Sequence, residues 1–297
     1  MKHLGPLLVA SAALLWGTDA IFRYPIADSV DATFIVFAEH LLGVALLVPW
    51  VATRARMRRE VFALNGREWA AAAFCGVFGS ALATTLFTAC FRYVNPSIAV
   101  LLQKLQPVIV VAIAFVALGE RPKRKFYFWA AVSLAAGVVL SFPDGKLGLE
   151  SREELDRAKG IFLAFAAAML WAVSTVSSKV LLKRASPDVA TLWRYVFGLV
   201  ALCFMLCLPH EPVHWSVVSS WPVARAVLYV SFISGIFPML FYYGGLSRTP
   251  ASVTTFIELL YPISAVVLNT LVLGTPLTAL QIVAGSVLMF AVTMIAL

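Results

Sequence analysis

Apolar residues occur in long runs along this chain, and short polar stretches separate them. A helix needs about 20 mostly apolar residues to cross a bilayer, and ten segments approach that length. They are residues 5–22, 33–52, 69–91, 97–118, 126–142, 160–178, 190–208, 223–243, 251–273 and 278–297. The pattern therefore predicts an all-α polytopic membrane protein with ten transmembrane helices.

The two halves of the chain share landmarks at a constant offset of 155 residues, as between Gly5 and Gly160. The other pairs are Trp16 and Trp171, Gly43 and Gly198, Ser97 and Ser252, Pro107 and Pro262, and Leu118-Gly119 and Leu273-Gly274. Because each half holds five spans, two copies must sit in the bilayer with opposite orientations, which is the inverted-repeat plan of secondary transporters. We expect residues 1–142 and 160–297 to be two inverted five-helix repeats around a central cavity.

The placement of charge indicates how the chain is oriented. Lys and Arg gather in the loops after the second, fourth, sixth and eighth spans, as at Arg54, Arg121 and Lys183. Since such loops stay cytoplasmic, we predict a multi-pass protein of the inner (plasma) membrane with both termini in the cytoplasm. Residues 143–159 carry charges of both signs and would form a periplasmic linker, either a plain solvated connector or a short amphipathic helix.

Composition excludes several other classes of protein. The chain is 61% hydrophobic and 13% charged, far from the balance of a soluble domain. Its net charge of +8 fits the cytoplasmic loops and gives no reason to expect nucleic acid, so the expected partners are the lipid bilayer and a small-molecule substrate, with a homodimer left open. No phosphate-binding loop, metalloprotease motif or nucleophile elbow occurs, which predicts no enzyme activity and no cofactor. The four cysteines are interpreted as reduced core residues.

Ionisable residues inside the predicted spans are the first candidates for function. A charge at the bilayer centre costs about 2.5–3.5 kcal/mol on insertion scales. The outer half of the bilayer would hold Asp19, Glu39, His40 and Lys104, and the inner half Arg194 and Glu258. We predict that Lys104 pairs with Glu39 or Asp19, and Arg194 with Glu258. These pairs would act as outer and inner gates, or as static contacts between helices.

Two prolines related by the repeat predict breaks in the helices near the bilayer midplane. Pro107 and Pro262 each remove one helix hydrogen bond and free a carbonyl four residues earlier, at Gln103 and Glu258. Transporters build substrate sites from broken helices at this depth. Both prolines are therefore candidate hinges, although proline is also common in ordinary membrane helices.

Two tryptophans lie in the middle of spans, although tryptophan normally marks the membrane interface. Trp16 and Trp171 occupy equivalent places in the two halves. They either pack in the core or line a cavity that stacks an organic substrate.

The whole chain resembles the drug/metabolite transporter superfamily, specifically its ten-span EamA-type members. The resemblance rests on ALLWG (13–17) and AMLWA (168–172), and on LQKLQPVIVVAIAFVALGERP (102–122) and IELLYPISAVVLNTLVLGTPL (257–277). It implies that spans 1–4 and 6–9 surround a central cavity, with spans 5 and 10 peripheral. The cavity residues carried over by position are Trp16, Asp19, His40, Gln103, Trp171, Tyr195, Glu258 and Tyr261. The second half departs at Thr275, where the first half has Glu120.

Within that superfamily the chain looks most like bacterial amino-acid and metabolite exporters, including the aromatic-amino-acid exporter. A zwitterion needs an acid, a base and apolar room, which Asp19 or Glu39, Lys104 and the two tryptophans supply. The expected function is export of small metabolites, most simply amino acids, by alternating access. A transporter of nucleotide sugars or other organic metabolites is the alternative within the same fold, and a receptor or scaffold without transport is the alternative outside it.

Overall fold

The computed structural model describes residues 4–118, 124–142, 144, 151–208, 214–249, 253–254 and 257–296, without the side chains of 113–118 and 296. Every regular element in these ranges is helical. The first half contains α1 (Leu4–Gly17), α2 (Asp19–Ala27), α3 (Ala32–Ala52), α4 (Ala55–Val61), α5 (Gly66–Gly76), η1 (Val77–Leu82), α6 (Ala83–Cys90), α7 (Pro96–Leu102), η2 (Gln103–Leu105), α8 (Gln106–Leu118) and α9 (Arg124–Ser141). The second contains α10 (Arg152–Leu181), α11 (Pro187–Leu206), α12 (Trp215–Val218), α13 (Trp221–Ser231), η3 (Phe232–Ile236), α14 (Phe237–Leu246), α16 (Leu260–Leu273) and α17 (Ala279–Ala296). The all-α prediction is confirmed for the described residues, which do not include Ser252, Gly119 or Glu120.

Six helical stretches of the described residues are long and apolar enough to cross a bilayer. They are Leu4–Ala27, Ala32–Ala52, Gly66–Cys90, Arg152–Leu181, Pro187–Leu206 and Trp221–Leu246. Shorter apolar helices cover Pro96–Ala112, Leu260–Leu273 and Ala279–Ile295, and α9 lies on the predicted fifth span. Every predicted span overlaps a helix, but the number of ten crossings stays a prediction.

Large apolar side chains cover the outside of the bundle. Leu7 is 64% exposed, Phe162 68% and Leu271 76%. Exposed apolar surface of this extent needs a nonpolar environment around it, and lipid provides one. Cys203 and Cys207 are also exposed, whereas Cys75 and Cys90 are buried, so the interpretation of all four as core residues was wrong for the α11 pair, which faces outward.

The two halves meet in symmetric contacts. If both residues of one contact are replaced by their repeat equivalents, the result is a second contact that the structure also contains. A Cβ atom on Gly43 would lie 2.2 Å from Cδ1 of Tyr195, and one on Gly198 would lie 2.6 Å from Cδ2 of His40. Residue 40 thus meets 198 while residue 43 meets 195, so the equivalent helices α3 and α11 run antiparallel. An inverted repeat requires this relation, although the orientation of the halves in a bilayer stays a prediction.

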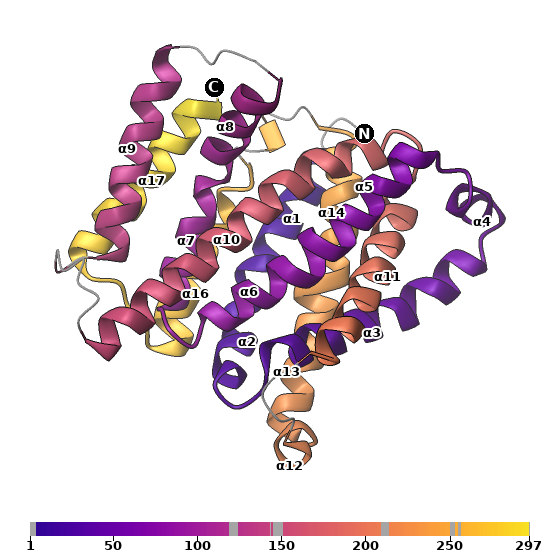
Figure 1. Ribbon diagram of the computed structural model, residues 1–297, viewed down its shortest axis with the longest axis horizontal. Coiled ribbons are helices and arrows are strands. Elements are labelled where there is room, and N and C mark those ends of the chain that lie inside the picture. The colour runs from indigo at the N-terminus through magenta and orange to yellow at the C-terminus, as the bar shows by residue number, and fades with distance from the viewer. Residues whose placement is uncertain are drawn as a thin grey trace.

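Helices α9 and α17 form a second antiparallel pair of equivalents, at the edge of the bundle (Figure 1). The Gln281 side chain donates to the Leu140 carbonyl oxygen at 3.2 Å. Further along both helices, the rings of Trp129 and Phe290 meet edge-on with centroids 5.5 Å apart. The pair lies to one side of the remaining helices, where the resemblance placed spans 5 and 10.

The helices are interrupted at matching places in the two halves. The π-helical segments η1 and η3 begin at Val77 and Phe232, which the repeat offset relates. Before Pro107, the Gln106 N–H donates to the Gln103 carbonyl, and before Pro262 the Tyr261 N–H donates to Glu258 at 3.2 Å. These tight turns arise because proline has no N–H for the regular helix bond. Breaks are present at both prolines, and hinge motion stays a prediction.

The C-terminal part of the expected linker is helical. Ser151 caps α10 by accepting from the Glu154 N–H, and the Glu154 carboxylate accepts from the Ser151 N–H. This capping box starts the helix at Arg152, so residues 152–159 are the first turns of α10 and no plain connector. The repeat boundary at residue 160 falls inside one continuous helix.

The close approach of α3 and α11 can be tested at Gly43. In Gly43→Ala the added methyl must displace the Tyr195 ring, and overpacking of this kind costs about 1–3 kcal/mol. We expect the thermal unfolding midpoint of the purified protein in detergent to fall by several degrees. Gly66→Ala is the matched control, because nothing lies within 4 Å of its added methyl. Equal midpoints for the two variants would contradict the tight contact.

The inverted orientation can be tested at the equivalent positions Arg59 and His214, both exposed. Arg59→Cys and His214→Cys are made in a variant whose four native cysteines are replaced by alanine. A membrane-impermeant maleimide added to intact cells should label His214→Cys, and should label Arg59→Cys only after the membrane is opened. Labelling of both from the same side would exclude the inversion.

Candidate functional site

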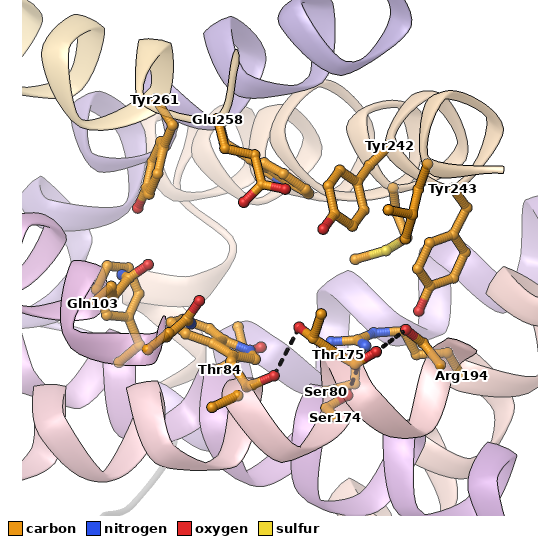
Figure 2. A pocket seen from close by; sticks show the side chains of 18 of the residues that line it. Ser80, Thr84, Gln103, Ser174, Thr175, Arg194, Tyr242, Tyr243, Glu258 and Tyr261 are labelled. Atoms are coloured by element: carbon orange, nitrogen blue, oxygen red, sulfur yellow. Dashed lines mark hydrogen bonds between the residues drawn. The ribbon is translucent and has the colours of Figure 1, made fainter. Parts of the chain in front are cut away.

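A cavity of about 420 Å³ lies between the two halves. In Figure 2 one wall carries Tyr261, Glu258, Tyr242 and Tyr243, and the facing wall carries Gln103, Thr84, Ser80, Thr175, Ser174 and Arg194. The lining includes many residues expected from the sequence: Trp16, Asp19, Glu39, Gln103, Lys104, Pro107, Trp171, Tyr195, Arg194, Glu258 and Tyr261. The structure therefore brings the two tryptophans and the intramembrane charges to one place.

His40 was expected in the cavity but is not among its lining residues. Its ring is 1% exposed and stacks on Tyr195, with centroids 4.8 Å apart. Nδ1 lies 2.8 Å from the Val36 carbonyl oxygen, which can only accept, so Nδ1 carries the proton. Nε2 then accepts from Ser80 Oγ at 2.8 Å. With both nitrogens bonded inside the protein, His40 supports Tyr195 from behind.

One end of the cavity is closed by a buried cluster centred on Arg23. The Arg23 guanidinium donates to both carboxylate oxygens of Asp19, at 2.8 and 2.9 Å, and to Glu39 Oε2 at 3.0 Å. Arg23 is 3% exposed and Glu39 5%. Ser234 adds a hydrogen bond from Oγ to Asp19 Oδ1 at 2.8 Å, which joins the cluster to the second half. We call Asp19, Arg23 and Glu39 the arginine cluster.

The opposite end of the cavity reaches the ends of α10 and α14. Its lining there includes Lys179 and Leu246, and Lys179 is exposed. The cavity is thus lined by an exposed residue at one end and by the buried arginine cluster at the other.

Lys104 does not pair with Glu39 or Asp19 as predicted, because Arg23 already engages both carboxylates. Its ammonium donates to the Glu258 backbone carbonyl at 3.4 Å and lies 5.1 Å from the centre of the Tyr261 ring. Pro262 explains this contact, because proline has no N–H to donate to the carbonyl four residues earlier. The Glu258 carbonyl can therefore accept from the Lys104 side chain. The Glu258 carboxylate points toward the Tyr242 hydroxyl (Figure 2).

Arg194 is not paired with Glu258 either. Nη1 donates to Ser174 Oγ at 3.1 Å, and Nη2 donates to the Gly79 carbonyl at 2.6 Å. Gly79 belongs to the π-helical segment η1, whose irregular backbone offers this oxygen to a side chain. The predicted pairing of Arg194 failed because the π-helical turn supplies a carbonyl acceptor, that of Gly79, which the sequence pattern did not indicate.

Aromatic rings line the cavity on facing sides. Trp16 lies 5.2 Å from Tyr242 and 6.5 Å from Tyr261, between ring centroids. Phe87 and Trp171 meet with centroids 5.2 Å apart, on the helices that carry Thr84 and Thr175 of the facing wall (Figure 2). We call these five side chains the aromatic walls. They present flat apolar faces to any occupant.

Several important residues escaped the sequence-based selection of sites. Arg23 lies just beyond the first predicted span, 5–22, yet its position four residues after Asp19 on one helix face was the available signal. Phe87 and Ser234 carried no signal, since only packing brings them to the cavity. Among the described residues, no group of three His, Cys, Asp or Glu side chains is placed to hold a metal ion.

The arginine cluster can be tested by removing its cation. Arg23→Met leaves the buried Glu39 and the half-buried Asp19 without a counter-ion, and breaking a buried pair in this way costs about 3–5 kcal/mol. We expect a large fall in the thermal unfolding midpoint, whereas Arg225→Met, at an exposed site, should change it little. Neutralising the cluster completely, with Asp19→Asn and Glu39→Gln added, should recover most of the loss. If Arg23→Met and Arg225→Met unfold alike, the ion pairs of the cluster do not stabilise the fold.

Comparisons with known proteins agree with this architecture. A relative from Fusobacterium nucleatum named "Riboflavin transporter ImpX" is 32% identical, over 96% of this chain and 94% of its own. An "Uncharacterized inner membrane transporter YhbE" from Escherichia coli K12 is 26% identical, over 74% of this chain and 67% of its own. A crystal structure of a protein with 22% identity matches with a TM-score of 0.62, over 98% of this chain and 95% of the other, which shows the fold alone.

The family comparison covers both halves of the chain. The model of the EamA-like transporter family matches residues 3–142 and again residues 158–297. Two matches, one in each half, agree with an internal duplication. The chain is a membrane transporter and belongs to the EamA-like transporter family.

Proposed function

We propose that this protein is a secondary transporter of a planar aromatic organic metabolite, with a flavin ring system as the leading candidate. The observation that carries the proposal is the cavity with its aromatic walls. Trp16 and Trp171, from equivalent places in the two halves, both line it. Tryptophan and tyrosine faces stack on flat rings and contribute about 0.5–1.5 kcal/mol per pair beyond the burial of surface.

The size of the cavity supports a solute of this kind. Its volume of about 420 Å³ lies within the range of about 300–1,000 Å³ in which small-molecule pockets fall. Polar groups among the aromatic ones, such as Gln103 and Glu258, supply the few directed contacts that set orientation. The printed name of the relative from Fusobacterium nucleatum, a riboflavin transporter, supports the flavin in particular.

Alternating access is the mechanism that we propose. The arginine cluster closes one end of the cavity, and the exposed Lys179 lies at the other. If both termini are cytoplasmic, as proposed from the loop charges, this conformation is open toward the cytoplasm of a cell whose inner membrane holds the protein. The antiparallel equivalents α3 and α11 would allow an opposite conformation built from the same kinds of contact.

An aromatic amino acid is the second candidate, and one observation favours it. The cavity lining contains acids and bases together, Glu258 beside Lys104 and, farther along, Arg194. Opposite charges inside one aromatic cavity suit a zwitterion, as expected from the sequence. The comparisons give no support for an amino acid, so we place it after the flavin.

Transport by proteoliposomes separates these candidates. Vesicles loaded with unlabelled riboflavin should accumulate labelled riboflavin by exchange, and unlabelled phenylalanine should not compete. Trp16→Ala and Trp171→Ala should each reduce exchange by about tenfold, because each removes a stacking face. Trp215→Ala is the control, since Trp215 is 70% exposed and lies outside the cavity lining.

The outcome against the proposal is equally specific. Exchange of tryptophan or phenylalanine without exchange of riboflavin would replace the flavin by the amino acid. Exchange of no solute in a panel of flavins, amino acids and sugar nucleotides, with and without a pH gradient, would contradict a transport function.

A further inference from the structure

Arg194 is a buried cation with no carboxylate in ion-pair contact among the described residues. It lines the cavity, is 7% exposed and donates only to neutral oxygens, those of Ser174 and Gly79. Its Nε–H has no hydrogen-bond partner. A guanidinium has five N–H donors, so Arg194 keeps donors that have no acceptor among the described residues.

The internal repeat shows why Arg194 lacks a counter-ion. Its equivalent in the first half is Glu39, which binds Arg23 at 3.0 Å. The positions equivalent to Asp19 and Arg23 are Ser174 and Ser178. The second half therefore has serines where the first half has a charged pair, and Arg194 keeps its charge without a carboxylate from its own repeat.

The acids that face Arg194 from neighbouring elements are engaged elsewhere. Glu39 on α3 interacts with Arg194 at longer range but gives its close contact to Arg23. Glu258 lies near Lys104, and its carboxylate points toward Tyr242 (Figure 2). An isolated buried charge is costly in a low-dielectric interior, and an anion in the cavity would remove that cost.

Tyr243 provides a second donor from the facing wall. Its hydroxyl points toward Arg194 (Figure 2) and has no hydrogen-bond partner among the described residues. Tyr243 is 2% exposed. The two side chains thus lie next to the aromatic walls, since the Tyr243 ring is 6.1 Å from the Tyr242 ring between centroids. The exposed Lys179 adds positive charge at the mouth of the cavity.

We propose that Arg194 and Tyr243 bind an anionic group of the transported solute, a carboxylate or a phosphate, while the aromatic walls hold its ring. The inference rests on the proposed function, since it concerns an occupant of the same cavity. It adds a preference that an aromatic cavity alone does not impose: a solute that carries negative charge at one end should bind more tightly than a neutral one with the same ring.

The test compares two flavins that differ only in the anion. Riboflavin and its 5′-phosphate share the ring and the side chain, and both fluoresce. Titrated against the purified protein in detergent, the phosphate should bind at least about tenfold more tightly, because charge-assisted hydrogen bonds are the strong ones. Arg194→Gln should abolish this preference, so that the variant binds riboflavin and its phosphate with similar affinity. Arg225→Gln, at an exposed site, is the matched control.

Two further variants keep the test decisive if Arg194→Gln does not fold. Tyr243→Phe removes one neutral donor and should weaken binding of the phosphate about threefold. Arg194→Lys keeps the charge without the planar guanidinium and should retain part of the preference. Equal affinity of the wild type for both flavins, or equal loss of both in the variants, would overturn the proposal.

A second pair of ligands separates failure of this inference from failure of the flavin assignment. If neither flavin binds, the flavin assignment is wrong, and indole-3-acetate and tryptamine then test Arg194 on another ring by calorimetry. The acid should bind in preference to the amine, and Arg194→Gln should remove its binding. Absence of any preference for the acid would overturn the anion site as well.

Discussion

A backbone carbonyl or N–H surrounded by hydrocarbon must be hydrogen-bonded within the protein, and this constraint governs where the helices of this chain can be broken. The irregular turns lie at equivalent places in the two halves, at η1 and η3 and ahead of Pro107 and Pro262. All of them contribute residues to the cavity lining. Two carbonyls at these breaks accept from cationic side chains, Glu258 from Lys104 and Gly79 from Arg194. The breaks and the charges therefore stabilise each other.

The same low dielectric gives the charged residues their unequal roles. Arg23 binds the carboxylates of both Asp19 and Glu39, so these three side chains together close that end of the cavity. Arg194 donates only to neutral oxygens, which leaves its charge available to a solute that enters the cavity. An internal duplication places equivalent side chains at both ends, and the later divergence of Asp19 and Arg23 from Ser174 and Ser178 makes the ends chemically different.

Small residues set how closely the two halves approach. Gly43 and Gly198 leave room for the rings of Tyr195 and His40, so the equivalent helices α3 and α11 pack closely against each other. Gly5 and Gly160 form a similar symmetric pair of contacts. Gly5 lies against Thr249, and Gly160 lies against Val94, which is the repeat equivalent of Thr249. Contacts without a side chain on one partner allow helices to approach and slide. In the proposed cycle, these seams are where the halves would move relative to each other.

The sequence by itself determined the helical class, the duplication, the position of the proline breaks and several residues of the cavity lining, the two tryptophans and the intramembrane charges among them. Each of these follows from local chemistry: apolar length, the missing proline N–H, and the cost of charge in lipid. Tertiary structure alone decided which charges pair, because partners depend on which carbonyls and carboxylates packing brings within reach. Arg23 takes both acids expected for Lys104, His40 turns away to bond Ser80, and Arg194 reaches a carbonyl that a π-helical turn exposes. Such choices depend on distances between helices far apart in the chain, which no residue pattern encodes.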